Sequence, residues 1–189
     1  MENMLLKAAK EGNEFAFAQI VETYEKRIYR LCYRMTGHAE DAADQTQETF
    51  LKAWRGLPSF QGDCSIGTWL HRLAVNCCID YLRKEKRHRT HAAAEESQTD
   101  AAVQNDVPDT GPGPYEQLLQ RERQEAVRRA MARLSPEHQA VLALREAGGL
   151  SYEEIASVLR IEEGTVKSRI ARARVQLRNL LLSDGTFLA

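Results

Sequence analysis

The 189-residue sequence has no apolar run that approaches the roughly 20 residues needed to cross a membrane. Its first residues, MENMLLKAAKEGNEF, lack the long apolar core of a secretory signal. These two absences predict a cytoplasmic protein without membrane insertion. The sequence also lacks the alternating pattern of β-strands and the glycine-rich loop that follows a strand in nucleotide-binding proteins. We therefore expect an all-α protein.

Metal-binding and catalytic spacings are missing as well. The four cysteines form no CxxC pair, and the adjacent Cys77 and Cys78 would point to different sides of a helix. Buried, reduced thiols are the favoured interpretation, ahead of a metal or redox site. None of the five histidines has a metal-ligand or triad spacing, and His71 is expected on a helix surface. The sequence therefore predicts no enzyme, no metal and no cofactor.

The net charge is also low, because the 26 basic side chains nearly balance the 27 acidic ones. Residues 93–117 contain six acidic side chains and no basic one, so both flanking parts are mildly basic. Most of this stretch has few large apolar residues, and it contains a Gly/Pro cluster, which is typical of a flexible segment. We predict two small helical domains, residues 1–91 and 115–189, joined by a flexible acidic linker over residues 92–114.

Apolar residues at steps of three and four predict three helices in the first domain. Asn13 is the expected N-cap of the first helix, and Gly37 is its expected left-handed C-cap. The second helix should span residues 39–56 and the third residues 66–87, with a turn-rich loop between them. The expected inner face of the second helix consists of Ala43, Phe50, Trp54 and Leu57.

The second domain is predicted to contain four helices, over residues 115–133, 136–147, 151–159 and 165–181. Ser151 and Glu154 have the spacing of a capping box. A short turn then leads into a helix with apolar residues on one side, a pattern typical of a helix-turn-helix. The residues predicted to contact DNA from this last helix are Thr165, Lys167, Ser168, Arg169, Arg172 and Arg174, and Gln176 is also expected to face outward.

Lys and Arg neutralise phosphates, and Arg also binds guanine through two hydrogen bonds. A row of basic residues by itself more often marks a solvated helix face. Here the capped preceding helix and the glycine-bearing turn favour DNA binding, because they would present the start of the last helix to the major groove.

Four segments carry a resemblance to a known family. GLSYEEIASVL (149–159) followed by GTVKSRIARAR (164–174) resembles the promoter-reading domain of extracytoplasmic-function (ECF) sigma factors of the sigma-70 family, and is also similar to LuxR-type regulators. DAADQTQETFLKAW (41–54) and SFQGDCSIGTWLHRLAVNCCIDYLRK (59–84) resemble the sigma domain that binds polymerase and opens the promoter. The resemblance implies a transcription initiation factor. A stand-alone repressor or activator would leave the N-terminal segments unexplained.

The resemblance also implies partners and residue roles. The partners are promoter DNA, core RNA polymerase (the clamp of its largest subunit and the flap of its second-largest) and an anti-sigma factor. The implied polymerase-docking residues are Asp41, Asp44, Gln47, Glu48, Phe50 and Trp54. The implied contacts to the −10 element are Ser59, Phe60, Gln61, Gly62, Asp63, Asn76, Arg83 and Lys84.

The residues themselves leave simpler alternatives open. The docking face could equally be an ordinary solvated surface, and Asn76 a surface amide. The cations after residue 82 equally suit a helix C-terminus, where they offset the helix dipole. Two hypotheses exist for the acidic linker: it occupies a basic channel of the polymerase, or it weakens DNA binding by the free protein.

Overall fold

A computed structural model describes residues 2–92 and 114–183. Within these two ranges the chain is helical and contains no strand, which confirms the all-α prediction. No helix in them is both long and apolar enough to cross a membrane. Residues 93–113 of the predicted linker lie outside the described ranges, so its flexibility stays a prediction. The elements are α1 (Glu2–Lys10), α2 (Glu14–Thr36), α3 (Ala39–Gly56), the 3-10 turn η1 (Leu57–Ser59), α4 (Ile66–Ala92), α5 (Pro114–Ala132), α6 (Pro136–Glu146), α7 (Tyr152–Leu159) and α8 (Glu163–Ser183).

The predicted helix-capping residues are confirmed, whereas α4 runs five residues beyond its predicted end at residue 87. The Asn13 side chain accepts a hydrogen bond from the backbone N–H of Ala16 (3.0 Å) and so caps α2. Gly37 ends the same helix with φ 80°, in the left-handed region that favours glycine. Ser151 and Glu154 form the reciprocal capping box that starts α7.

The inner face of α3 differs from the prediction. Ala43 is exposed, whereas Ala42, Thr46 and Thr49 are buried beside Phe50 and Ala53. The two threonine hydroxyls donate to backbone carbonyls one turn earlier, at 2.7 Å each, so their burial leaves no unpaired donor. A prediction based on apolar spacing misses this face, because two of its five buried residues are polar and have local hydrogen-bond partners.

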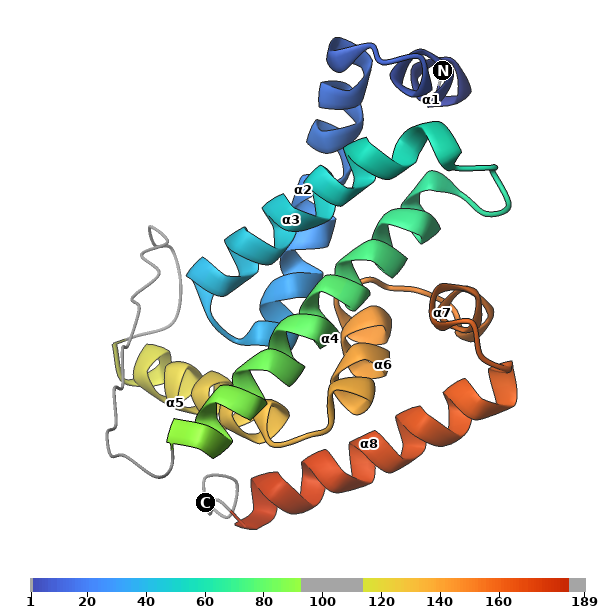
Figure 1. The fold of residues 1–189 in the computed structure, drawn as a ribbon. Helices are drawn as coiled ribbons and strands as arrows, with labels where there is room; N and C mark the ends of the chain where they lie inside the picture. Colours follow the sequence, from blue (N-terminus) through green and yellow to red (C-terminus); the bar gives the residue numbers. More distant parts are fainter. Residues whose placement is uncertain (1, 93–113, 184–189) are drawn as a thin grey trace.

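The two predicted domains pack against each other. Figure 1 shows α6 between α4 and α8, and α6 contacts both α2 and α4 of the N-terminal half. Its residues from Gln139 to Leu144 are all buried. A helix that is buried all round needs neighbours on every side. Here both halves of the chain supply them.

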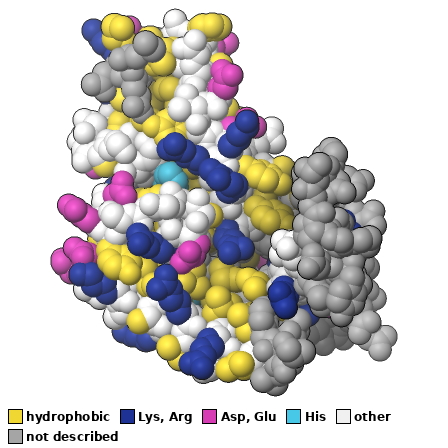
Figure 2. Space-filling model, turned by 180° about the vertical axis from the view of Figure 1, so that it is seen from behind, with side chains coloured by type: hydrophobic (Ala, Val, Ile, Leu, Met, Phe, Trp, Pro, Cys, Tyr) yellow, Lys and Arg dark blue, Asp and Glu magenta, His cyan; other side chains and the backbone are white. Residues whose placement is uncertain are grey.

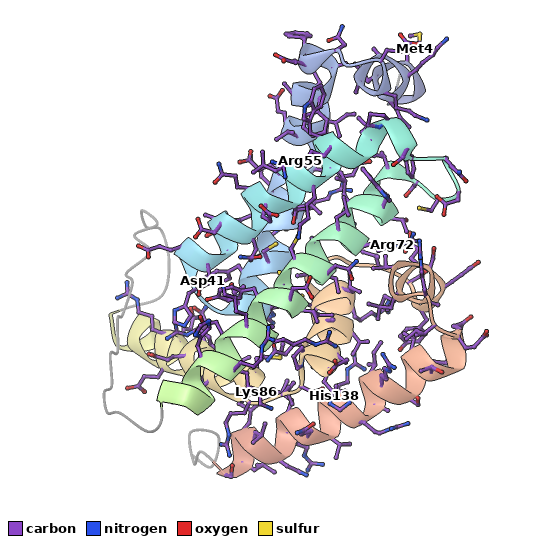
Figure 3. All side chains as sticks on the ribbon, viewed as in Figure 1. Met4, Asp41, Arg55, Arg72, Lys86 and His138 are labelled. Carbon is purple, nitrogen blue, oxygen red and sulfur yellow. The ribbon has the colours of Figure 1, made fainter. Side chains whose placement is uncertain are left out.

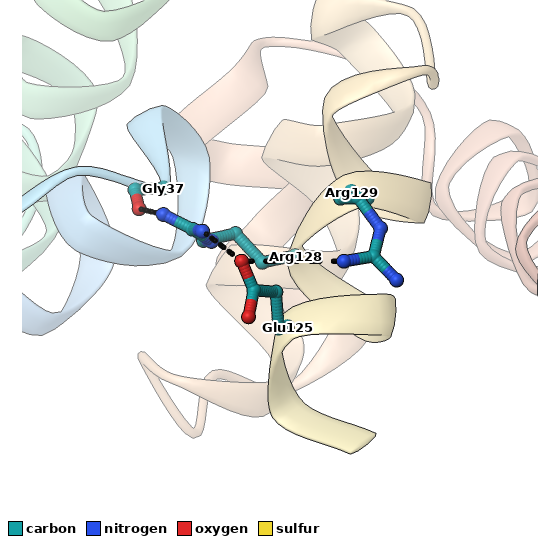
Figure 4. A network of polar contacts seen from close by, with 4 residues as sticks. All are labelled: Gly37, Glu125, Arg128 and Arg129. Carbon is teal, nitrogen blue, oxygen red and sulfur yellow. Dashed lines mark hydrogen bonds and ion pairs between the residues drawn. The ribbon is translucent and has the colours of Figure 1, made fainter. Parts of the chain in front are cut away.

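Polar contacts also join the halves. Arg72 on α4 donates to the backbone carbonyl of Ser157 on α7 (3.0 Å), and Arg83 forms an ion pair with Glu137 of α6 (3.0 Å). The pKa of Glu137 is lowered by a hydrogen bond from its own backbone N–H, and further by Arg83. On the other side, Arg128 of α5 donates to the carbonyl of Gly37 (3.3 Å). Figure 4 shows this bond, together with the Glu125 carboxylate that holds the same guanidinium and also contacts Arg129.

His71 was expected on a helix surface, and that prediction is wrong. The ring is only 6% exposed, its Nδ1 lies 2.6 Å from the Gly67 carbonyl, and its Nε2 is buried without a partner. Burial lowers the pKa of His71 below its ordinary value of 6.5, and the charge of Arg27 on α2 acts in the same direction. The Gly67 carbonyl and Glu154 on α7 oppose this shift only in part.

This burial predicts a pH effect on stability. Because the pKa of His71 is lower in the folded state, the unfolded chain binds the proton more readily, and stability declines as the pH falls below about 6.5. In His71→Leu this part of the decline should disappear. Denaturant unfolding of both proteins at several pH values between 7.5 and 5 would measure it, and parallel curves would contradict the assignment.

Candidate nucleic-acid and polymerase interfaces

The predicted helix-turn-helix is formed by α7 and α8. Val166, Ile170 and Ala173 of α8 are buried and pack with Ile155 and Val158 of α7. The turn between the helices contains Arg160 in the left-handed region (φ 55°), a conformation unusual for a residue with a side chain. Because one side of α8 is fixed in the core, the opposite side, with Ser168 and Arg172, faces solvent or stays half-exposed.

The predicted DNA contacts on α8 have different surroundings. Lys167 forms an ion pair with Glu163 (2.7 Å). The hydrogen bond to the Glu163 carboxylate raises the pKa of the Lys167 ammonium group. Arg174 is turned towards α6, where it pairs with Glu146 (3.0 Å). Arg172 is exposed and has no acidic partner among the described residues; its guanidinium lies 3.5 Å from the Ser168 hydroxyl. Of these three cations, Arg172 is therefore the one most available to a ligand.

The remaining predicted residues of α8 are less exposed. Thr165, Ser168 and Arg169 are half-buried, and the Ser168 hydroxyl donates to the carbonyl of Thr165 (3.0 Å). Gln176 is exposed as expected, but its side-chain oxygen lies 3.0 Å from the His138 ring of α6. Figure 3 shows His138 on α6, facing α8.

Basic charge is not confined to α8. Figure 2 shows Lys and Arg side chains spread among apolar ones down the middle of the opposite face. On α2, for example, Lys26, Arg30 and Arg34 are exposed. Charge alone therefore does not locate a DNA site on this molecule. The position of Arg172 on the solvent side of a helix-turn-helix is the more specific observation.

The loop between η1 and α4 has a fixed frame and an exposed middle. The Ser59 hydroxyl donates to the Gly56 carbonyl (2.8 Å), and at the other end the Ser65 hydroxyl accepts from the backbone N–H of Thr68 (3.1 Å). Between them Gln61, Gly62 and Asp63 are exposed, and Gly62 has φ 77°. This exposed middle is the part of the predicted −10 site that a base could reach.

The other predicted −10 residues of this half differ in how exposed they are. The ring of Phe60 is 5% exposed and packs on Trp69, with ring centroids 5.0 Å apart, so its side chain supports the loop from inside. Asn76 lies on α4 with its side chain exposed. Further along α4, Arg83 is held by Glu137, whereas Lys84 is exposed.

The predicted polymerase-docking residues on α3 form an acidic and amide surface. Asp44 and Gln47 are exposed, and half-buried Glu48 pairs with Lys52 (3.5 Å). Figure 3 shows Asp41 near the start of the helix, where it is half-buried. This surface can accept basic side chains from a partner.

The aromatic residues assigned to this surface lie mostly inside the fold. Phe50 is 8% exposed, and Trp54 packs on Phe17, with ring centroids 4.9 Å apart. The apolar side chain that does reach the surface is Leu51, which is 44% exposed. Leu51 was not among the predicted docking residues, although its spacing from Gln47 and Glu48 puts it on their side of the helix.

Three of the four cysteines are buried, as predicted. Cys32, Cys77 and Cys78 are buried and Cys64 is half-buried, all as free thiols. Burial raises the pKa of the Cys64 thiol, and the neighbouring Asp63 adds to this. In the two described ranges no three His, Cys, Asp or Glu side chains are grouped so that they could hold a metal ion.

Comparison with known proteins gives two family matches. Sigma-70 region 2 matches residues 20–88, and Sigma-70, region 4 matches residues 124–177. The chain is 34% identical to the ECF RNA polymerase sigma factor SigW of Bacillus subtilis (strain 168) over 184 residues, which cover 96% of this chain and 98% of that protein. It is 36% identical to the ECF RNA polymerase sigma factor SigM of Mycobacterium tuberculosis (strain ATCC 25618 / H37Rv) over 177 residues, 94% of this chain and 83% of that protein.

Two solved structures share the fold. CnrH, in complex with the cytosolic domain of CnrY, has a TM-score of 0.68 and 26% identity, over 97% of this chain and 98% of that chain. The sigma factor RpoE from Bartonella quintana, in complex with the anti-sigma factor NepR, has a TM-score of 0.65 and 24% identity, over 89% of this chain and 98% of that chain.

Region 2 and region 4 in this order, on an all-helical fold, define a sigma-70-type transcription initiation factor. The chain belongs to the ECF group of that family, the RNA polymerase sigma factors to which SigW and SigM are assigned. Its helix-turn-helix is the DNA-binding region 4.

Proposed function

We propose that this sigma factor uses three separate faces: α8 to read the −35 duplex, the loop at residues 59–68 with Asn76 to hold a −10 base, and α3 to dock on the polymerase clamp. The observation that carries the proposal is that each face has exposed polar side chains backed by a buried side of the same element. Arg172 on α8, Asn76 on α4 and Asp44 on α3 are the examples. A buried backing fixes the direction of a contact residue before the ligand binds.

On α8, Arg172 is the proposed base-reading residue. It is exposed and free of acidic partners among the described residues, and Arg can bind a guanine edge through two hydrogen bonds. Thr165, Ser168 and Arg169 flank it and suit contacts to phosphates near the start of the helix. Lys167 and Arg174 reach DNA in this proposal only after leaving Glu163 and Glu146.

At the −10 site, the exposed residues 61–63 and Asn76 would face the flipped base. An amide offers both donors and an acceptor to a base edge, which suits Asn76 to this role. Phe60 contributes its backbone and the packing of its ring instead of a direct contact. Lys84 would add a phosphate contact at the end of α4, and Arg83 would do so once released from Glu137.

On α3, the proposed clamp-binding surface consists of Asp41, Asp44, Gln47, Glu48 and Leu51. Leu51 gives the surface an apolar contact among acids and amides. Interfaces commonly combine such a centre with a polar rim. Phe50 and Trp54 hold the helix in place from behind. Region 4 would contact the flap of the second-largest subunit.

The two halves must separate when the factor works. Positions −35 and −10 are 25 base pairs apart, which is about 85 Å of B-DNA at 3.4 Å per base pair. A compact chain of this length has a radius of gyration of only about 16 Å. Both DNA-reading faces therefore reach their elements together only if the contacts of α2 and α4 with α6 and α7 are broken.

Regulation by an anti-sigma factor is proposed from the solved relatives. CnrH was solved with the cytosolic domain of CnrY, and RpoE with the anti-sigma factor NepR. The exposed acidic and apolar surface of α3 is the natural target for such a partner, because it is also the surface for polymerase. We further propose a cytoplasmic location and no catalysis by this chain, since the polymerase performs the chemistry.

Run-off transcription with core polymerase and a promoter library tests the function. We expect promoter-dependent transcripts only when the chain is added, and about five- to hundredfold less promoter opening with Asn76→Ala, the cost of one lost bidentate base contact. Duplex −35 binding should be unchanged, and Gln124→Ala, an exposed amide on α5, is the matched control. Absence of transcripts with wild-type protein would refute the function; equal loss of duplex binding and opening would refute the role of Asn76.

A further inference from the structure

The N-terminal helix α1 lies before the family matches, which begin at residue 20, and its contacts suggest a use. Ala9 is 2% exposed, and Leu5 and Leu6 are partly buried against the core. The helix ends in a tight turn at Gly12 (φ 90°), after which Asn13 starts α2. It packs on α2 and on η1, so it is held beside the start of the −10 loop.

Lys10, the last residue of α1, makes the decisive contact. Its Nζ donates a hydrogen bond to the backbone carbonyl of Phe60 at 2.6 Å, in a partly buried position and across 50 residues of sequence. Hydrogen bonds with a charged donor are among the stronger ones in proteins. The bond therefore ties the loop to an element outside α3, η1 and α4.

The tied residue stands where the loop begins to be exposed. The backbone N–H of Phe60 donates to the Leu57 carbonyl (3.1 Å), its ring packs on Trp69, and Lys10 holds its carbonyl. Phe60 is thus fixed at the N–H, at the ring and at the carbonyl. The next residue, Gln61, is exposed, as are Gly62 and Asp63. The direction in which this exposed segment leaves the fold depends on the peptide group that Lys10 holds.

We propose that Lys10 is a positioning residue for the −10 site: it holds the Phe60 carbonyl and so preorganises residues 61–63 for the unpaired bases. This inference rests on the proposed function. A loop that is already ordered loses less conformational freedom when the strand binds, so affinity for single-stranded −10 DNA rises. Lys10 acts through the loop and need not touch the DNA itself.

The test uses the full chain bound to core polymerase and a non-template-strand oligonucleotide carrying the −10 element of a promoter found by run-off transcription. We expect Lys10→Ala to weaken oligonucleotide binding about five- to twentyfold, less than the full effect of one lost hydrogen bond with a charged donor, because the bond holds the loop and does not contact the DNA. Lys10→Arg, which still donates, should restore most of the affinity. Affinity for core polymerase and for −35 duplex should be unchanged, and discrimination between −10 bases should weaken.

Two further measurements separate positioning from a direct phosphate contact. Removal of a phosphate contact to this single-stranded DNA would reduce the slope of log affinity against log salt by about 0.7. Loss of a positioning bond should leave that slope unchanged. Lys7→Ala removes an exposed charge from the same helix and is the matched control, with no expected effect.

The outcomes are distinguishable. If the wild-type holoenzyme binds the oligonucleotide and Lys10→Ala binds it equally well, the inference is overturned while the proposed function stands. A reduced salt slope in Lys10→Ala, or failure of Lys10→Arg to restore binding, also overturns it. If wild-type holoenzyme does not bind the oligonucleotide, the proposed function fails, and the role of Lys10 fails with it.

Discussion

A covalent bridge between α4 and α6 should abolish promoter-dependent initiation without unfolding the protein. Arg83 and Glu137 are suitable positions, because their side chains already meet at 3.0 Å across the two halves. With the bridge in place, the −10 and −35 readers cannot move apart to span about 85 Å of promoter DNA. We expect initiation to fall to background.

The experiment uses Arg83→Cys/Glu137→Cys and a short cleavable bis-maleimide. Cys64 is the half-buried native thiol and is first changed to Ser, while the other three native thiols are buried. Run-off transcription is measured before bridging, after bridging and after cleavage of the linker. Each single-cysteine protein treated in the same way is the control. Full activity of the bridged protein would show that the two halves need not separate.

The packed arrangement of the two halves has features that favour their separation. The Arg83–Glu137 pair is partly exposed, and such pairs contribute about 0–1 kcal/mol. Nearer the start of α4, His71 Nε2 and Arg72 Nε are buried without partners, and an unsatisfied buried polar group costs about 1–3 kcal/mol. Because Arg72 contacts the backbone of α7, separation of the halves would return its side chain to water. Opening also exposes the face of α6 that packs on α2 and α4, and the binding energy of polymerase and DNA must offset that cost.

Local sequence signals predicted local structure well. Asn13, Gly37 and the Ser151–Glu154 box each act through bonds within a few residues, so their spacing alone indicates a helix end. Helix α1 escaped prediction because a nine-residue helix is marginal by itself and depends on packing. The burial of His71 was missed for a related reason, since it results from the close approach of α2 and α7 to α4.

The sequence alone does not show which of the predicted contact residues are exposed to a ligand. Phe60 and Phe50 belong to matching motifs, yet their rings are buried, and Leu51 takes the exposed apolar position on α3. Arg174 lies in the predicted basic row, but Glu146, 28 residues earlier, turns it towards α6. Partners that are distant in sequence decide these outcomes. The packing of the two halves likewise depends on contacts between residues that are distant in sequence.

The difference between Arg172 and Arg174 gives a second large effect. Arg172→Ala should weaken binding of the holoenzyme to its cognate −35 duplex by about 1–3 kcal/mol, the contribution of a bidentate base contact. Arg174→Ala should have a much smaller effect, because that guanidinium is engaged by Glu146 at 3.0 Å. Arg172→Lys keeps the charge but loses the planar guanidinium that donates two parallel hydrogen bonds. Discrimination between bases should therefore be as weak as in Arg172→Ala.

Fluorescence anisotropy with a set of single-base-pair variants of the −35 duplex measures these differences. A base contact predicts that Arg172→Ala loses affinity for the cognate duplex and discriminates less at one base pair, while binding to unrelated duplex changes little. A uniform loss on every sequence would instead assign Arg172 to a phosphate. If Arg174→Ala proves as damaging as Arg172→Ala, the pair between Arg174 and Glu146 does not persist on DNA.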